Sequence, residues 1–219
     1  MKEGGGHDMK KRKILTFIIL WVVFSLSVIS TAWGESISKI YQQSYEEEGK
    51  GNYQEAIFVL MRASQAGDNS YLYHLRLGWL QYLVSKFPDS VNSYRKAVTM
   101  SKDSIEAKLG LMLPLMAQGK WSDAEKVGRE ILFVDKLSYL ANSRLAYIYY
   151  NLRQYKEAEV YYRNVLSFYP GDIEMQAGLA WSLLKQDKKE AAGRVFDEIL
   201  RYVPNHVSAN SGMKIVRGK

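Results

Sequence analysis

The residues of this chain that are best suited to binding chemistry are aromatic, and they recur at a fixed spacing. Trp79, Tyr147 and Trp181 are separated by 68 and 34 positions (147 − 79 and 181 − 147). Tyr45 precedes Trp79 by the same 34 positions (79 − 45), and Leu113 takes the remaining place in the series. Aromatic rings bind the apolar side chains of a peptide or stack on the faces of sugar rings. The spacing therefore predicts a binding surface to which several repeated units each contribute a side chain.

Groups that perform catalysis are few and isolated. The three histidines, His7, His74 and His206, show no metal-ligand spacing, and the chain has no cysteine. The sequence contains no Ser, His and Asp grouping and no glycine-rich phosphate loop. We therefore expect no enzyme activity, no cofactor and no bound metal. We expect His74 to be a partly exposed residue of a helix.

The whole chain after the N-terminal segment follows one repeat period. It is clearest in a ladder of small residues, Ala56, Ser90, Ala124, Ala158 and Ala192, each 34 positions after the last. Large apolar residues repeat with the same period, so each unit is predicted to be two antiparallel helices joined by a short turn. The predicted fold is an all-α solenoid of about five helix pairs with a short C-terminal capping helix. The predicted units are 37–70, 71–104, 105–138, 139–172 and 173–206, and the predicted cap is 207–216.

The third unit departs from this pattern at two positions. Gly128 stands in a column that holds aromatic residues in neighbouring units, and Pro114 falls inside a predicted first helix. Proline has no N–H and crowds the carbonyl of Gly110, so we expect a bend there. Gly51 and Gly119 are expected in the turns between paired helices.

Residues 1–34 are predicted to form a signal peptide or a membrane anchor. Basic residues 10–13 precede an uncharged apolar run over 14–29, and small residues follow as far as Gly34. Cleavage after Ala32 or Gly34 would release an exported, periplasmic protein. Retention would leave an inner-membrane anchor with the repeats outside the cytoplasm. Met9 is an alternative start of translation.

The net charge of +7 does not indicate nucleic-acid binding. Five basic and two acidic residues before the apolar run contribute +3, which leaves +4 for the remaining chain. That charge is scattered and forms no basic block, unlike the clustered charge of proteins that bind nucleic acids.

The fourth unit shows the most specific pattern. It resembles the tetratricopeptide repeat in Leu145-Ala146, Tyr149, Tyr155, Ala158, Tyr162 and Pro170, and the resemblance covers residues 37–206. It implies a right-handed α-solenoid whose first helices line a concave groove that binds protein partners. The residues that the resemblance places in this groove are Tyr41, Tyr45, Leu75, Trp79, Tyr82, Leu113, Met116, Tyr147, Tyr150, Trp181 and Leu184.

Not all of these groove positions are equally informative. Tyr82 and Tyr150 also suit packing between repeats, whereas Trp79, Tyr147 and Trp181 are the stronger candidates for ligand contact. Arg76 and Arg144 lie beside the groove register; they could meet an acidic group of a ligand, but we expect them to be solvated surface residues.

The leading functional hypothesis is a non-catalytic, exported scaffold that binds a protein or peptide in this groove. Its setting would be bacterial envelope assembly, secretion or export. The alternative is a module that binds envelope polysaccharide or cell wall and supports a separate enzyme. A third possibility is a structural spacer that associates through the ends of its solenoid. The sequence does not identify the partner.

Overall fold

The computed structural model describes residues 37–218, which form helices joined by short turns, with no strand among them. The predicted leader, residues 1–34, lies outside this range. None of the helices within it is long and apolar enough to cross a membrane. A helix over residues 37–49 comes first. The helices that follow are α2 (Tyr53–Gln65), α3 (Tyr71–Leu83), α4 (Phe87–Met100), α5 (Ile105–Ala117), α6 (Trp121–Val134), α7 (Tyr139–Asn151), α8 (Tyr155–Phe168), α9 (Ile173–Lys185), α10 (Lys189–Tyr202) and α11 (Val207–Val216).

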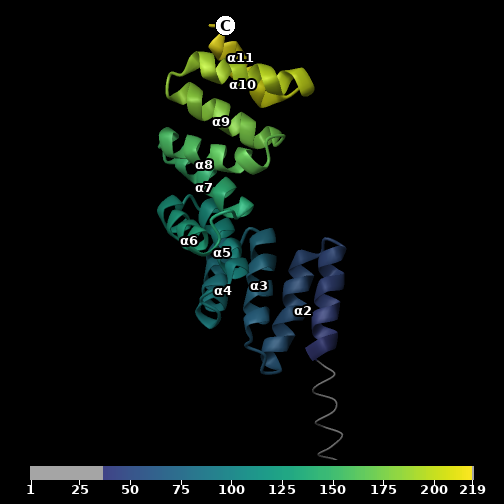
Figure 1. The fold of residues 1–219 in the computed structure, drawn as a ribbon. Helices are drawn as coiled ribbons and strands as arrows, with labels where there is room; N and C mark the ends of the chain where they lie inside the picture. Colours follow the sequence, from purple (N-terminus) through teal and green to yellow (C-terminus); the bar gives the residue numbers. More distant parts are fainter. Residues whose placement is uncertain (1–36, 219) are drawn as a thin grey trace, which may run out of the picture. The chain divides into compact units, whose positions relative to one another are not determined.

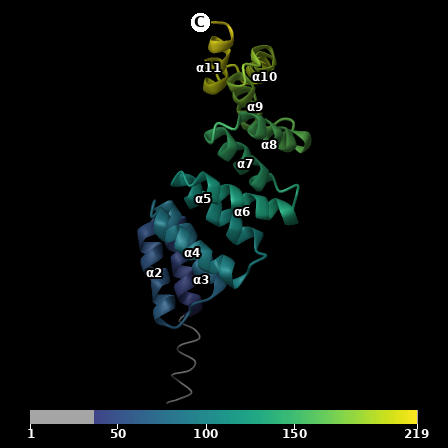
Figure 2. The ribbon, with the colours of Figure 1, turned by 90° about the vertical axis from the view of Figure 1, so that its left-hand side faces the viewer.

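The described residues form two compact units, 37–73 and 74–218, and each is described by itself. In the second unit each helix from α4 to α10 packs against the next one (Figure 1). Helix α11 packs on both α9 and α10 and covers the end of the array (Figure 2). The predicted all-α solenoid of stacked helix pairs with a terminal helix is therefore confirmed.

The ladder of small residues is buried throughout. Each of its five members has no exposed surface. In the second unit the Ser90 hydroxyl donates a hydrogen bond of 2.7 Å to the carbonyl of Gly78 on the paired helix. In the first unit the Ser44 hydroxyl donates to the carbonyl of Ala56 at 2.9 Å. Small side chains thus allow the two helices of a pair to approach until a side chain of one reaches the backbone of the other.

A second recurring contact joins successive pairs. The aromatic residue near the middle of a second helix lies against a glycine 16 positions later, on the next first helix. A methyl group added at any of these glycines would overlap the ring, so glycine is what allows the ring to lie there. The pairs are Tyr94 with Gly110, Tyr162 with Gly178, and Phe196 with Gly212.

In the third unit the small residue and the large residue of this contact exchange places. Gly128 stands in the aromatic column, and Arg144, 16 positions later, stands in the glycine column. The space beside Gly128 is filled by the side chains of Leu145 and Met112. Helix α5 of this unit continues through Pro114 to Ala117, so the bend that we expect at Pro114 stays a prediction.

Polar side chains also follow the period of 34, at the start of each first helix. Ser70, Ser104, Asp172 and His206 each accept a hydrogen bond from the backbone N–H three residues later. Such caps satisfy donors that have no partner within the helix. An asparagine or glutamine stands four residues after the cap position in three of the repeats. Its side-chain amide donates a hydrogen bond to the backbone carbonyl six residues earlier. These residues are Asn142, Gln176 and Asn210.

Two expectations about polar side chains are wrong. His74 is only 3% exposed and Arg76 only 5%, so neither is a solvated surface residue. Arg144 is half-buried, and its guanidinium donates to the carbonyl of Leu109 on α5. Both arginines stand in the column that holds glycine in neighbouring repeats.

The turn inside each pair needs one residue in the left-handed region. These residues are 34 positions apart, and two of them are the predicted turn glycines, Gly51 (φ 80°) and Gly119 (φ 67°). The other three are not glycine: Ser85 (φ 59°), Arg153 (φ 60°) and Asp187 (φ 62°). A residue with a Cβ is strained in this region by roughly 1–2 kcal/mol.

We predict that Gly178→Ala destabilises the protein by about 1–3 kcal/mol, because the added methyl displaces the Tyr162 ring from a packed core. Gly171→Ala is the matched control, since no atom lies within 4 Å of the added group. It should change the free energy of unfolding by less than about 0.5 kcal/mol. Urea unfolding followed by circular dichroism measures both. A Gly178→Ala protein as stable as wild type would contradict the proposed contact.

We predict that Arg153→Gly stabilises the protein by about 0.5–1 kcal/mol, because glycine relieves the left-handed strain. Gly119→Ala should destabilise it by about 1 kcal/mol, for the converse reason. Arg153→Ala keeps the strain and serves as the control for loss of the arginine side chain. The midpoints of thermal unfolding rank the three variants, and equal midpoints for Arg153→Gly and Arg153→Ala would disprove the turn argument.

Candidate functional site

A pocket of about 400 Å³ opens in the second unit, between first helices of the last two repeats and the terminal helix. This volume falls in the range of sites that bind small molecules or single anchoring side chains. Its lining residues are Ser143, Tyr147 and Tyr150 of α7, Tyr162 of α8, Glu174, Met175, Ala177, Gly178, Trp181 and Lys185 of α9, and Ser208 of α11.

Three of the predicted groove residues meet in this pocket: Tyr147, Tyr150 and Trp181. Tyr41 and Tyr45 lie in the first unit, on the helix over residues 37–49. The other six lie in the second unit but do not line this pocket: Leu75, Trp79, Tyr82, Leu113, Met116 and Leu184.

The predicted residues outside the pocket have contacts of their own. The Tyr41 hydroxyl donates to the Asp68 carboxylate at 2.6 Å, and burial together with this bond raises its pKa. Trp79 stacks on Tyr82 with their ring centroids 6.0 Å apart, and Tyr82 in turn contacts Phe87. Leu75, Met116 and Leu184 are half-buried against the core.

Trp181 forms the wall of the pocket nearest the C-terminus. Its indole N–H donates to the Ser208 hydroxyl at 2.7 Å, which ties α9 to α11. Its ring also meets Phe196 edge to face, with centroids 5.6 Å apart. These contacts leave the indole half-buried and fixed, so it offers a rigid surface to a ligand.

Tyr147 and Tyr150 form the opposite wall, on α7. Tyr147 is 50% exposed and rests edge-on against Trp121, with centroids 6.0 Å apart. Tyr150 is half-buried against Tyr155, and burial raises the pKa of its hydroxyl. The pocket therefore has a partly exposed aromatic wall facing a fixed one.

Tyr162 reaches the pocket from the second helix α8. The tip of its ring lies over Gly178, and the side chain is only 5% exposed. Burial raises the pKa of its hydroxyl, with smaller contributions from Tyr150 and Tyr147, so the hydroxyl stays protonated. No residue among 37–218 forms a hydrogen bond with it. Tyr162 is not among the predicted groove residues, although Phe196, in the same column, shows that this packing needs no hydroxyl.

Opposite charges stand at the two ends of α9. Glu174 lies in its first turn and Lys185 in its last. They are eleven residues apart along the helix, which corresponds to about 16 Å. His206 lies 3.5 Å from Glu174. Neither Glu174 nor Lys185 was among the predicted groove residues, because charged residues at helix ends are common on any surface.

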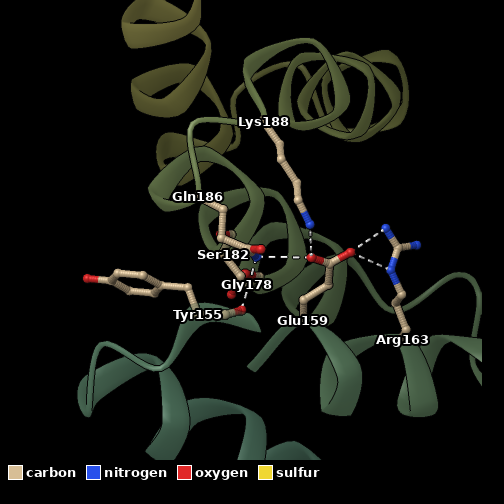
Figure 3. A network of polar contacts seen from close by, with 7 residues as sticks. All are labelled: Tyr155, Glu159, Arg163, Gly178, Ser182, Gln186 and Lys188. Carbon is tan, nitrogen blue, oxygen red and sulfur yellow. Dashed lines mark hydrogen bonds and ion pairs between the residues drawn. The ribbon is translucent and has the colours of Figure 1, made fainter. Parts of the chain in front are cut away.

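Two sets of polar contacts hold the walls of the pocket in register. The Tyr139 hydroxyl at the start of α7 donates to Asp172, the cap of α9, at 2.6 Å, and this bond raises the pKa of Tyr139 to about 12. Glu159 of α8 receives Lys188 at 2.8 Å and the Gln186 amide at 2.9 Å (Figure 3). Lys188 and Gln186 thus fix the turn after α9 to α8, and Arg163, on α8 itself, also pairs with Glu159.

Comparison with family models identifies the repeats. Residues 113–173 and 149–211 each match a model described as tetratricopeptide repeat. Residues 113–211 contain tetratricopeptide repeats. Both wall-forming helices of the pocket, α7 and α9, lie within these tetratricopeptide repeats. A search of curated proteins finds no match.

Solved structures share the fold at low sequence identity. A tetratricopeptide repeat protein from Parabacteroides merdae ATCC 43184 is 19% identical, with a TM-score of 0.77, over 84% of this chain and 75% of that one. A MamA protein is 19% identical, with a TM-score of 0.70, and the match covers 77% of this chain and 92% of that one. MamA from Desulfovibrio magneticus RS-1 is 13% identical, with a TM-score of 0.73, and the match covers 78% of this chain and 97% of that one. At these identities the likeness shows the fold alone.

We predict that the Glu159 network makes the protein sensitive to acid. Burial alone would raise the pKa of Glu159, but hydrogen bonds from Lys188, Gln186 and Arg163 hold it below its usual value. The carboxylate therefore stabilises the fold above the ordinary glutamate pKa of about 4.3. That contribution is lost as the pH falls through the lower pKa of the folded state.

Glu159→Gln should accordingly be less stable than wild type at pH 7 and should lose less stability between pH 5 and about pH 3. Glu198→Gln, on the exposed side of α10, removes the same charge without a network and is the control. Urea unfolding across this pH range measures the difference. Identical pH profiles for Glu159→Gln and wild type would rule out the network as the cause.

Proposed function

We propose that this protein is a non-catalytic adaptor that holds a segment of a protein partner in the pocket between α7, α9 and α11. Tetratricopeptide repeats are a protein–protein interaction scaffold, and that fold is the framework of the proposal. The observation that carries it is the aromatic pocket, where Tyr147 leaves half of its surface exposed opposite a fixed Trp181. Concave apolar sites with a few convergent polar groups are typical ligand sites.

A peptide suits this pocket better than a polysaccharide. Stacking on a sugar needs an open ring face, whereas Trp181 is half-buried between Phe196 and Ser208. A peptide side chain can instead enter edge-on between the two walls. The charges of Glu174 and Lys185 would then meet the segment on either side of this anchor.

We further propose that the adaptor acts outside the cytoplasm, in envelope assembly, secretion or export. This rests on the basic and apolar pattern of residues 10–29. If the leader is cleaved, the protein is periplasmic; if it is retained, the adaptor is held at the inner membrane.

Site-specific cross-linking in intact cells tests this function. With p-benzoylphenylalanine in place of Tyr147, light should give a covalent adduct with a defined protein. The same group in place of Phe133, which is 88% exposed on α6 and outside the pocket, is the control and should not give that adduct. Ser143→Arg puts a long side chain into the pocket and should abolish the adduct at position 147. Ser167→Arg, on the exposed part of α8, should leave the adduct unchanged.

Absence of a protein adduct at position 147, or an adduct that persists with Ser143→Arg, would refute groove binding. Fractionation of the same cells tests the location. Recovery of the adduct in the cytoplasm would refute export.

A further inference from the structure

The packing of the Tyr162 ring on its glycine does not require the hydroxyl. Three aromatic residues of the same column lie on glycines in the same way, and one of them, Phe196, does so without a hydroxyl. At the second, Tyr94, the guanidinium of Arg144 is close enough to interact electrostatically. The Tyr162 hydroxyl forms no hydrogen bond with another residue among 37–218. Packing alone therefore does not explain why residue 162 carries a hydroxyl group.

The position of this hydroxyl suits a ligand. The ring tip passes over the backbone of Gly178, where no side chain blocks it, and lines the pocket between α7 and α9. The side chain is buried, and its pKa is raised chiefly by that burial, so the hydroxyl can both donate and accept a hydrogen bond at physiological pH. This hydroxyl is therefore a hydrogen-bonding group on a buried side chain that lines the pocket beside Tyr147, Tyr150 and Trp181.

An anchor that entered the pocket would expel the water that reaches this hydroxyl. A purely apolar anchor such as phenylalanine would leave the hydroxyl buried without a partner, which is costly. A site that contains a hydrogen-bonding group discriminates against ligands that cannot pair with it. The geometry therefore favours a flat ring with a polar tip.

We propose that the pocket binds a tyrosine side chain of the partner and that Tyr162 selects it over phenylalanine. The proposal rests on the adaptor function above and names the residue that the adaptor recognises. The partner ring lies between Tyr147 and Trp181, and its phenol exchanges a hydrogen bond with the Tyr162 hydroxyl. Because both phenols donate and accept, the bond forms in either direction.

Two small probes that differ by one hydroxyl test this selectivity. N-acetyl-L-tyrosinamide and N-acetyl-L-phenylalaninamide are titrated into the ¹⁵N-labelled full-length protein. The indole N–H signal of Trp181, assigned with Trp181→Phe, is followed by NMR. We expect the tyrosine amide to bind wild type more tightly, by on the order of five- to tenfold, the worth of one neutral hydrogen bond.

Tyr162→Phe should bring this ratio close to one. The variant should fold, because Phe196 already packs on its glycine as a phenylalanine. Tyr94→Phe removes the hydroxyl from the same column outside the pocket and is the matched control; it should keep the preference of wild type.

Four results would overturn the proposal: equal affinity of wild type for the two amides, a preference that survives in Tyr162→Phe, no shift with either amide, or a shift only with the sugar probe N,N′-diacetylchitobiose. The cross-linking result at position 147 does not depend on which side chain anchors the partner. An adduct at position 147 without selectivity for tyrosine would therefore refute the tyrosine proposal alone. Absence of the adduct would refute the adaptor function.

Discussion

The contact between an aromatic ring and a glycine, repeated from one helix pair to the next, sets the spacing of the second unit. Tyr94, Tyr162 and Phe196 each lie where a glycine on the following first helix leaves room for a ring. A pair of helices cannot bury its apolar faces alone, so the fold depends on this contact to join one pair to the next. The pocket includes one of these contacts, since Tyr162 and Gly178 both line it.

The third unit shows how this contact can vary without loss of the fold. Gly128 and Arg144 reverse the usual sizes, and Leu145 and Met112 fill the vacated space. Arg144 then reaches across to the Leu109 carbonyl on α5, on the side of α7 away from the pocket. The guanidinium is partly buried there, which lowers its pKa, and nearby Tyr82 and Tyr94 partly offset this effect. One side of α7 is therefore occupied by an intramolecular arginine, while its other side is open to a ligand.

Much of the fold could be read from spacing alone, because each helix pair repeats the same packing problem at the same position. The small-residue ladder is buried, the predicted terminal helix is formed, and Gly51 and Gly119 take left-handed conformations in the turns. The errors concern side chains whose surroundings come from another helix. His74, Arg76 and Arg144 look like surface residues in sequence, but His74 and Arg76 are buried and Arg144 is half-buried. Of the predicted groove residues, only Tyr147, Tyr150 and Trp181 converge on the pocket, because a column gives the face of a helix and not the distance to its neighbours.

By itself, the sequence determined the repeat period, the helix pairs and the register of the aromatic residues, because these follow from the local periodicity of apolar and small side chains. The tertiary structure alone decided which of those aromatics share a cavity. It also placed Tyr162, a residue of a second helix, in a groove otherwise lined by first helices and the terminal helix. The physical reason is that Gly178, on the following helix, opens the path for its hydroxyl, and this relation between two helices becomes evident only once they are packed together.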